Sequence, residues 1–224
     1  MNKKKLLSML IALCLIAAIG VGATLAYFTD EETATNIITM GSVGIALVET
    51  PVEQDEDGAY HPAADATPVT DGLEFRDVMP GDTVPKDPTV VLDADSHDAY
   101  IRVRMEYVVP EGSTITEEDL EILDTALRAR ILEDARWYYD AGDDVYYYSE
   151  VLTNSEPDAN AAALFTEVTI PGAWLNNTAG QEFRIALTAE AIQAENLNEV
   201  IAANTNADGQ ITGWGDAAAA SDLN

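Results

Sequence analysis

The alternation of apolar and polar residues is most regular over residues 99–109. Apolar side chains occupy every second position, and charged ones lie between them, which is the period of a strand with one face in a core and the other in water. Residues 182–192 show a similar alternation. We therefore predict two long strands, each with one buried face. The apolar positions are Ile101, Val103, Met105 and Tyr107 in the first strand, and Phe183, Ile185, Leu187 and Ala189 in the second.

Shorter strand-like segments, separated by Pro-, Gly- and Asp-containing turns, fill much of the remaining chain. The acidic residues 50–71 have little to bury and are expected to form an exposed loop. Pro85 and Pro88 are expected to block ladder pairing around them. The predicted short strands are residues 37–49, 73–78, 89–92 and 165–170, together with a hairpin whose strands, 137–139 and 145–151, flank an acidic turn.

A helical pattern interrupts the strands. Thr116, followed by three acidic residues, is typical of a capped helix start, and an apolar stripe continues from there to Ile131. Residues 197–203 form a weaker second helix. Many short strands with turns between them and no βαβ alternation predict an all-β fold, an antiparallel β-sandwich or jelly roll with one or two inserted short helices.

The N-terminus has the pattern of an export signal. Three lysines precede an uncharged apolar run over residues 6–21, and small residues follow. We predict a signal peptide over residues 1–26, with cleavage between Ala26 and Tyr27; an uncleaved anchor is the alternative. The only cysteine, Cys14, lies within this signal, so the exported chain has no thiol. The predicted organisation of the rest is an N-terminal segment over residues 27–48, a domain over 49–215 and a disordered tail over 216–224.

The charge is strongly negative. The full chain has a formal net charge of −29, and removal of the signal leaves eight basic residues against 40 acidic ones. Such a chain repels phosphate backbones, so nucleic acid is excluded as a partner. The same charge makes self-association sensitive to salt, divalent cations and acid.

Two acidic turns are candidate calcium sites, because each places three carboxylates within a few residues and calcium prefers hard oxygen ligands. The alternative is that these aspartates favour a turn by hydrogen bonding to their own backbone. No other cofactor is indicated. The candidate ligands are Asp93, Asp95 and Asp98 in the first turn, and Asp140, Asp143 and Asp144 in the second.

Enzymatic activity has little support in the residues. A catalytic zinc site commonly uses two histidines spaced as in HExxH, whereas this chain has only His61 and His97, both in predicted loops. No cysteine of the exported chain is available as a nucleophile. The aromatic residues at 137–139 and 146–148 could stack on a polysaccharide, but alternation predicts that about half of them face the core.

Several stretches resemble a known family. Residues 22–36 read GATLAYFTDEETATN, and GSV follows at 41–43. This pattern resembles the signal junction of proteins processed by a SipW-type signal peptidase, the family that includes TasA, CalY and camelysin. Similar stretches are MPGDTVPKDP at 79–88, DAYIRV at 98–103 and AEAIQAE at 189–195.

The resemblance implies a secreted jelly-roll subunit of extracellular fibres, located in a biofilm matrix or on the surface of a Gram-positive type of cell. It implies that the N-terminal segment freed by the peptidase completes the sheet of the next subunit. The alternative is that this segment pairs within its own sheet, and both can hold in turn. The residues expected to form the donated strand are Ile37, Ile38, Met40, Val43, Ile45 and Leu47.

The expected partners are therefore further copies of the chain and the SipW-type peptidase, with a matrix polysaccharide or an accessory fibre protein as additional candidates. Two other functions remain as alternatives. One is a secreted calcium- or carbohydrate-binding module that does not assemble. The other is a camelysin-like metalloprotease, against which the missing zinc motif argues.

Overall fold

The computed structural model describes residues 43–174, 178 and 180–215. By its internal contacts the chain divides into two units, Met1–Met40 and Gly41–Asn224, and the first lies outside the described residues. The predicted signal peptide, its cleavage site at Ala26 and Tyr27, and the tail 216–224 lie outside them too. So do three residues of the predicted donor strand, Ile37, Ile38 and Met40.

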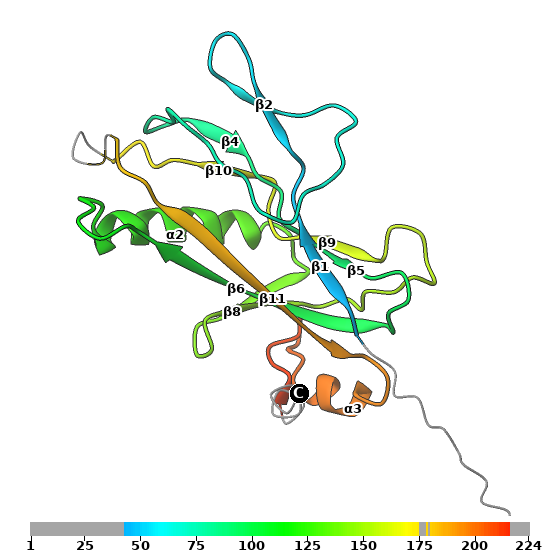
Figure 1. Ribbon diagram of the computed structural model, residues 1–224. Coiled ribbons are helices and arrows are strands. Elements are labelled where there is room, and N and C mark those ends of the chain that lie inside the picture. The colour runs from blue at the N-terminus through cyan, green and yellow to red at the C-terminus, as the bar shows by residue number, and fades with distance from the viewer. Residues whose placement is uncertain (1–42, 175–177, 179, 216–224) are drawn as a thin grey trace, which may run out of the picture. The chain divides into compact units, whose positions relative to one another are not determined.

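The larger sheet has four antiparallel strands in the order β11-β6-β8-β7 (Figure 1). Strands β6 (Ala99–Val108) and β11 (Arg184–Gln193) pair over ten residues each. These are the two long strands that alternation predicts. Strands β7 (Trp137–Asp140) and β8 (Val145–Tyr148) form the predicted hairpin.

Shorter strands form the remaining sheets. A three-stranded antiparallel sheet has the order β1-β5-β9, with β1 at Ile45–Val48, β5 at Thr89–Leu92 and β9 at Ala161–Ala163. Strand β4 (Thr83–Pro85) pairs with β10 (Glu167–Thr169), and β2 (Val52–Gln54) pairs with β3 (Tyr60–Pro62).

One apolar core joins the larger sheet to the three-stranded one. Ile101 and Val103 of β6 belong to the same buried cluster as Val90 and Leu92 of β5, and all four are at most 2% exposed. Val84 of β4 and Val168 of β10 extend this cluster. Two layers that share a core in this way form a β-sandwich. The predicted all-β antiparallel fold with inserted helices is therefore confirmed.

Helix α2 (Glu117–Ile131) forms one boundary of this core. Its start is a capping box: the Thr116 hydroxyl accepts a hydrogen bond from the Asp119 backbone N–H, and the Asp119 carboxylate accepts one from the Thr116 N–H. Its apolar stripe, Leu123, Leu127 and Ile131, is buried in the main cluster. The predicted inserted helix is confirmed at the predicted residues.

A second, smaller core covers the opposite face of the larger sheet. Helix α3 (Asn198–Ala203) and the segment that follows contribute Ile201, Ile211 and Trp214, which pack with Tyr100 and Tyr147 of β6 and β8. Arg102 lies on the same face, with its guanidinium 4.5 Å from the centre of the Trp214 ring. The prediction that this face of β6 meets water is therefore wrong at its N-terminal end.

Three local predictions are wrong. Residues 50–71 contain the hairpin β2-β3 instead of an unstructured loop, although its tip is exposed.

Residues 73–78 form no strand and are instead held by Tyr60. The Tyr60 hydroxyl accepts a hydrogen bond from the Arg76 N–H, and Phe75 packs edge-on against the Tyr60 ring. Pro85 lies within β4, which has a single described sheet partner, so its missing N–H interrupts no second ladder.

The capping box gives a first prediction. Replacing Thr116 by Ala should lower the free energy of unfolding by about 1 kcal/mol, because the Asp119 N–H loses its acceptor. Thr125→Ala is the matched control on the exposed face of the same helix, and it should be neutral or slightly stabilising. Urea unfolding followed by circular dichroism measures both. Equal effects of the two variants would contradict the capping role.

The cap should also depend on pH. Hydrogen bonds from the Thr116 backbone and hydroxyl hold the pKa of Asp119 below its ordinary value of 3.8. Its contribution to stability is therefore present above that value and is lost as the pH falls through the lower pKa of the folded state. Asp119→Asn should accordingly lower the free energy of unfolding at neutral pH, and urea unfolding should show that this difference from the unmodified protein shrinks below about pH 4.

Candidate functional site

The two predicted calcium turns do not bring their carboxylates together. Within the described residues, no group of three or more His, Cys, Asp or Glu side chains is arranged to hold a metal ion. At the β7-β8 turn, the Asp140 carboxylate accepts a hydrogen bond from the Gly142 N–H, and the Asp144 carboxylate accepts one from the Tyr139 hydroxyl. Asp143 lies 3.5 Å from the Tyr147 hydroxyl. These contacts match the turn alternative, and calcium binding stays a prediction.

In the first acidic turn, backbone carbonyls accept hydrogen bonds from residues both within the turn and far from it in the sequence. The Asp93 carbonyl accepts a hydrogen bond from the Ser96 N–H, and it also accepts one from the Asn154 side-chain amide. The Asp98 carbonyl accepts a hydrogen bond from the Ala194 N–H, just beyond β11. No contact of the Asp95 carboxylate enters this arrangement. The turn therefore ties β5, β6 and the end of β11 together.

The histidines do not form a catalytic set. His61 lies on β3 with its Nε2 2.9 Å from the Asp55 carboxylate, and both side chains are exposed. That contact lowers the pKa of Asp55, with two backbone N–H groups adding to the effect. His97 lies in the turn between β5 and β6. A third residue that could orient either imidazole for catalysis is absent from the described contacts of both.

The tyrosines of β8 are core residues, whereas Tyr138 and Tyr139 of β7 are half-buried. All four residues of β8 are buried, with Tyr146 and Tyr148 in the main core and Tyr147 in the second one. Burial raises the pKa of Tyr148 to about 12. These tyrosines are therefore not available to stack on a sugar, and alternation correctly predicts that the rings divide between two faces.

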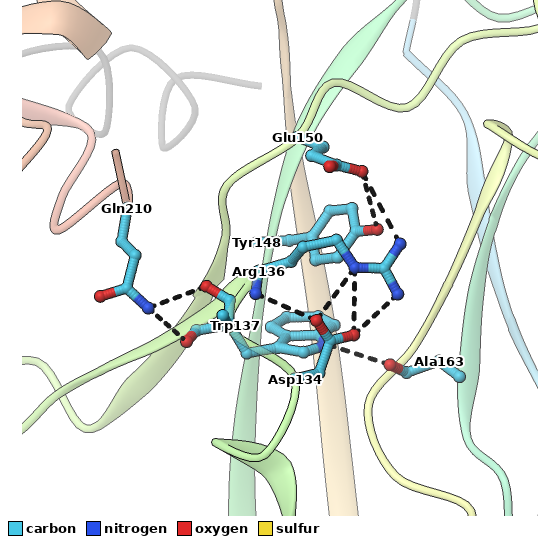
Figure 2. Close-up of polar contacts among 8 residues, drawn as sticks. Asp134, Arg136, Trp137, Tyr148, Glu150, Ala163 and Gln210 are labelled. Carbon is cyan, nitrogen blue, oxygen red and sulfur yellow. Dashed lines mark hydrogen bonds and ion pairs between the residues drawn. The ribbon is translucent and has the colours of Figure 1, made fainter. Parts of the chain in front are cut away.

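The β7 edge of the larger sheet is closed. The Trp137 indole N–H donates a hydrogen bond of 2.9 Å to the Ala163 carbonyl of β9, which joins the edge strands of the two layers (Figure 2). The Gln210 side-chain amide donates to the carbonyls of Ala135 and Trp137. Two backbone carbonyls at the start of this edge, those of Ala135 and Trp137, are thus satisfied within the chain.

Arg136, just before β7, forms ion pairs beside this edge. Figure 2 shows Arg136 bonded to the Asp134 carboxylate, with Glu150 on its other side. The hydrogen bonds that Arg136 donates to the Asp134 carboxylate are the main cause of its raised pKa, and the charge of Glu150 adds to the effect. The guanidinium also lies 5.4 Å from the centre of the Tyr148 ring.

Strand β1 is held at its start by the first acidic turn. The Gly44 N–H donates to the Ser96 hydroxyl, and the Gly44 carbonyl accepts from the Asp93 N–H. A Cβ atom at Gly44 would lie 2.3 Å from the Asp93 carboxylate, so a larger residue here would have to displace the Asp93 side chain. Ile45 and Leu47 then pair with Leu92 and Val90 of β5.

The other end of β1 is fixed by charged and polar side chains. Glu49 and Lys86 form an ion pair whose side chains are only 6% and 11% exposed. Next to it, the Thr50 N–H and hydroxyl both donate to the Asp87 carboxylate, at 2.8 and 2.6 Å. Glu49 also forms an antiparallel bridge with Val69. Strand β1 is therefore held at both ends within its own sheet.

A hollow of about 160 Å³ separates β1 from β11. Its lining consists of Leu47 of β1, Ile185 and Leu187 of β11, the Glu49–Lys86 pair and residues 69–72. Within the described residues β11 has one sheet partner, β6, and β1 lies within 8 Å of it by Cα distance. We define this hollow as the open seam, and it is the candidate functional site.

Comparison of the chain with protein-family models, with curated proteins and with solved structures finds no match. Among the described residues no helix is long and apolar enough to cross a membrane. The fold and the open seam therefore carry the functional argument together with the family resemblance.

The sequence did not predict the long-range contacts that fix the strands at the sheet edges. Lys86 and Glu49 are 37 positions apart, and the Trp137–Ala163 bond joins residues 26 apart. Lys86 lies in the family-like stretch 79–88, but nothing in that stretch points to Glu49, and no sequence signal links Trp137 to Ala163. The apolar alternation of residues 183–189 did identify the wall of the seam that β11 provides.

The buried ion pair gives a second prediction. Lys86→Met should lower the free energy of unfolding by about 3–5 kcal/mol, because it leaves the Glu49 carboxylate buried without a counter-ion. The double variant Glu49→Leu with Lys86→Met should recover most of that loss.

The exposed pair of Arg76 and Glu74, which is 75% and 73% exposed, provides the control: Arg76→Met should leave the free energy of unfolding nearly unchanged. Chemical denaturation of the four proteins measures these differences. If the double variant is as unstable as Lys86→Met alone, the loss does not come from an uncompensated charge.

Proposed function

We propose that the protein is a secreted structural subunit that assembles head to tail into extracellular fibres, in a biofilm matrix or on a Gram-positive type of cell surface. Assembly uses the N-terminal segment that a SipW-type peptidase frees. The observation that carries the proposal is that β1 is held at both ends, which leaves the apolar residues before it as the part that can be donated.

The segment that can be donated is shorter than the sequence analysis predicts. Ile45 and Leu47 pair with β5, and Val43 packs against the main core, so donating them would break contacts within the subunit. We therefore assign donation to residues 27–42 and call this segment the arm. It contains the apolar residues Ile37, Ile38 and Met40, which favour an extended strand.

Strand donation suits these residues physically. An extended segment that joins the edge of another sheet gains a ladder of backbone hydrogen bonds, and its alternate side chains enter pockets on one face. Donor and acceptor are different surfaces of the subunit, so the contact is heterologous. When such a contact does not close into a ring, it produces a filament.

The charge of the subunit sets the conditions for assembly. Mature subunits with 40 acidic and eight basic residues repel each other, and this repulsion weakens as salt screens it. Divalent cations should therefore promote assembly as counter-ions, whether or not a discrete calcium site exists. The proposal assigns no catalytic step to the chain.

The third prediction concerns the arm. The mature protein beginning at Tyr27 should form filaments visible by electron microscopy, whereas a protein beginning at Val43 should remain monomeric. Ile38→Asp should also prevent filaments while leaving the thermal unfolding midpoint unchanged, because a charge in the apolar arm opposes burial in the acceptor. Ile38→Leu, which keeps the apolar surface, should assemble normally.

Ile45→Asp separates the arm from β1. Ile45 packs against the main core, so this substitution should lower the unfolding midpoint, unlike Ile38→Asp. If the mature protein stays monomeric across salt, calcium and mildly acidic conditions, the fibre function is refuted, and a non-assembling secreted module becomes the better description.

A further inference from the structure

The outer face of the larger sheet, which points away from the main core, is partly covered by the C-terminal part of the chain. Residues 194–215, which include α3, follow directly after β11, and in Figure 1 they lie beside the end of that strand. We call these residues the flap. The flap and the sheet share the second core, whose buried cluster is separate from the main one. Its buried residues are Tyr100, Val145, Tyr147 and Ile192 of the sheet, and Ala194, Ile201, Ile211 and Trp214 of the flap.

The flap keeps its shape mainly through its own hydrogen bonds. The Ala194 N–H donates to the Asp98 carbonyl at the point where the flap leaves β11. Beyond this point, the backbone–backbone hydrogen bonds of the flap in the described chain all join two flap residues. The Asn206 side chain also accepts hydrogen bonds from two backbone N–H groups of its own loop. The flap is therefore an internally bonded unit.

Few polar contacts hold the flap against the sheet. The Gln210 side-chain amide donates to the carbonyls of Ala135 and Trp137, as Figure 2 shows. The Ile211 N–H donates to the Ser149 hydroxyl. Among the residues that the structure describes, no ion pair joins the flap to the rest of the chain. Since β6 and β11 pair along ten residues each, opening the flap breaks far fewer hydrogen bonds than separating the strands.

Trp214 anchors the flap through side-chain contacts. Its side chain is buried and lies edge-on to the Tyr147 ring, with centroids 5.8 Å apart, and the Arg102 guanidinium lies 4.5 Å from its centre. The buried indole N–H has no hydrogen-bond partner among the described residues. An unpaired buried donor opposes the closed state, because water can bond to it once the flap opens.

The flap has little stability of its own. Helix α3 has six residues, and no side chain caps its start at Leu197, whereas Thr116 caps α2. Helices this short do not persist in water without packing. Asn196 has a φ of 67°, a left-handed turn conformation between β11 and α3. The folded state of the flap therefore depends on docking to the sheet.

The charges of the flap oppose this docking. The flap contains Glu195, Glu199 and Asp208 and no lysine or arginine, and the rest of the mature chain is acidic too. Like charges on the two parts repel each other. Burial of apolar side chains must therefore hold the flap closed.

We propose that the flap opens as a unit while the sandwich stays folded, and that opening uncovers the outer face of the larger sheet. Segments with few buried contacts and few bonds to the rest of a fold open first in this way. The open state exposes Val145 and Tyr147, and it frees the carbonyls of Ala135 and Trp137. The flap is thus a conformational device that controls access to an apolar sheet face. It operates within a single subunit and is independent of the proposed fibre function.

Hydrogen exchange of the mature protein at low salt, read by mass spectrometry, tests the flap directly. Amides of residues 197–212 should be at least about tenfold less protected than those of β6 and β11. Low concentrations of urea should accelerate exchange in β6 and β11 but change it little in the flap, because opening the flap exposes less surface than global unfolding.

Two variants separate the flap from the sandwich. Val90→Ala removes apolar surface from the main core, so it should lower the protection of β6 and β11 and leave that of the flap unchanged. Trp214→Ala should lower the protection of the flap, because it removes the anchor. Circular dichroism checks that both variants are folded. If Val90→Ala lowers the protection of the flap and the sandwich by the same factor, the flap opens only by global unfolding and the proposal is overturned.

A disulfide lock gives a second test within one protein. No cysteine follows residue 26, and the Ile211 nitrogen lies 3.1 Å from the Ser149 hydroxyl oxygen. Ser149→Cys combined with Ile211→Cys should therefore allow a bond across the boundary of the flap, which the intact mass verifies. The oxidised protein should protect the flap as well as β6 and β11, and reduction should remove this gain. Equal flap exchange in the oxidised and reduced forms would also overturn the proposal.

Discussion

The packing of two sheets around one apolar core is the interaction on which the rest of the structure depends. Ile101 and Val103 of β6 contribute to the same buried cluster as Val90 and Leu92 of β5, and no cysteine after residue 26 can replace this packing with a covalent link. Helix α2 adds Leu123, Leu127 and Ile131 to the cluster. Because one core connects both layers, every strand edge has a fixed position relative to the others.

The backbone N–H and C=O groups of the edge strands in a β-sandwich either find partners within the chain or stay available to pair with another chain. The chain closes one side with the Trp137–Ala163 hydrogen bond and with Gln210, and it fixes β1 through Gly44 at one end and through Glu49 and Thr50 at the other. Strand β11 has no second sheet partner among the described residues, but β1 lies within 8 Å of it by Cα distance. The two sides of the larger sheet are therefore protected in different ways.

The charges of the chain act at two different ranges. At short range, the buried Glu49–Lys86 pair and the Arg136 cluster fix particular strands because their partners lie within hydrogen-bonding distance. At long range, the excess of acidic residues opposes the approach of identical subunits. In the proposed assembly, favourable strand pairing would have to exceed this repulsion, so the ionic conditions should control whether filaments form.

Much of the fold could be predicted from the sequence, because local patterns specify local structure. Alternation identified β6 and β11, and the Thr116 capping box with its apolar stripe identified α2. The tripeptide of alanines in β9 has no strand signal, and the β2-β3 hairpin lies in a stretch whose acidic composition is typical of a loop. Strand β9 was missed because it pairs with β5, which is distant in the chain, whereas β2 and β3 are neighbours in the chain and were missed because of their acidic composition.

Some features of the candidate site could likewise be predicted from the sequence, and others depend on the tertiary structure. The sequence by itself determined the apolar arm and the acidic charge, because both follow from composition. It also determined that one face of β11 is apolar, because this follows from the alternation of its residues. Only the tertiary structure decided that β1 is fixed, that β7 is closed and that β1 lies beside β11. Sheet order and the Glu49–Lys86 and Trp137–Ala163 contacts join residues many positions apart, and such contacts exist only once the core has brought the strands together.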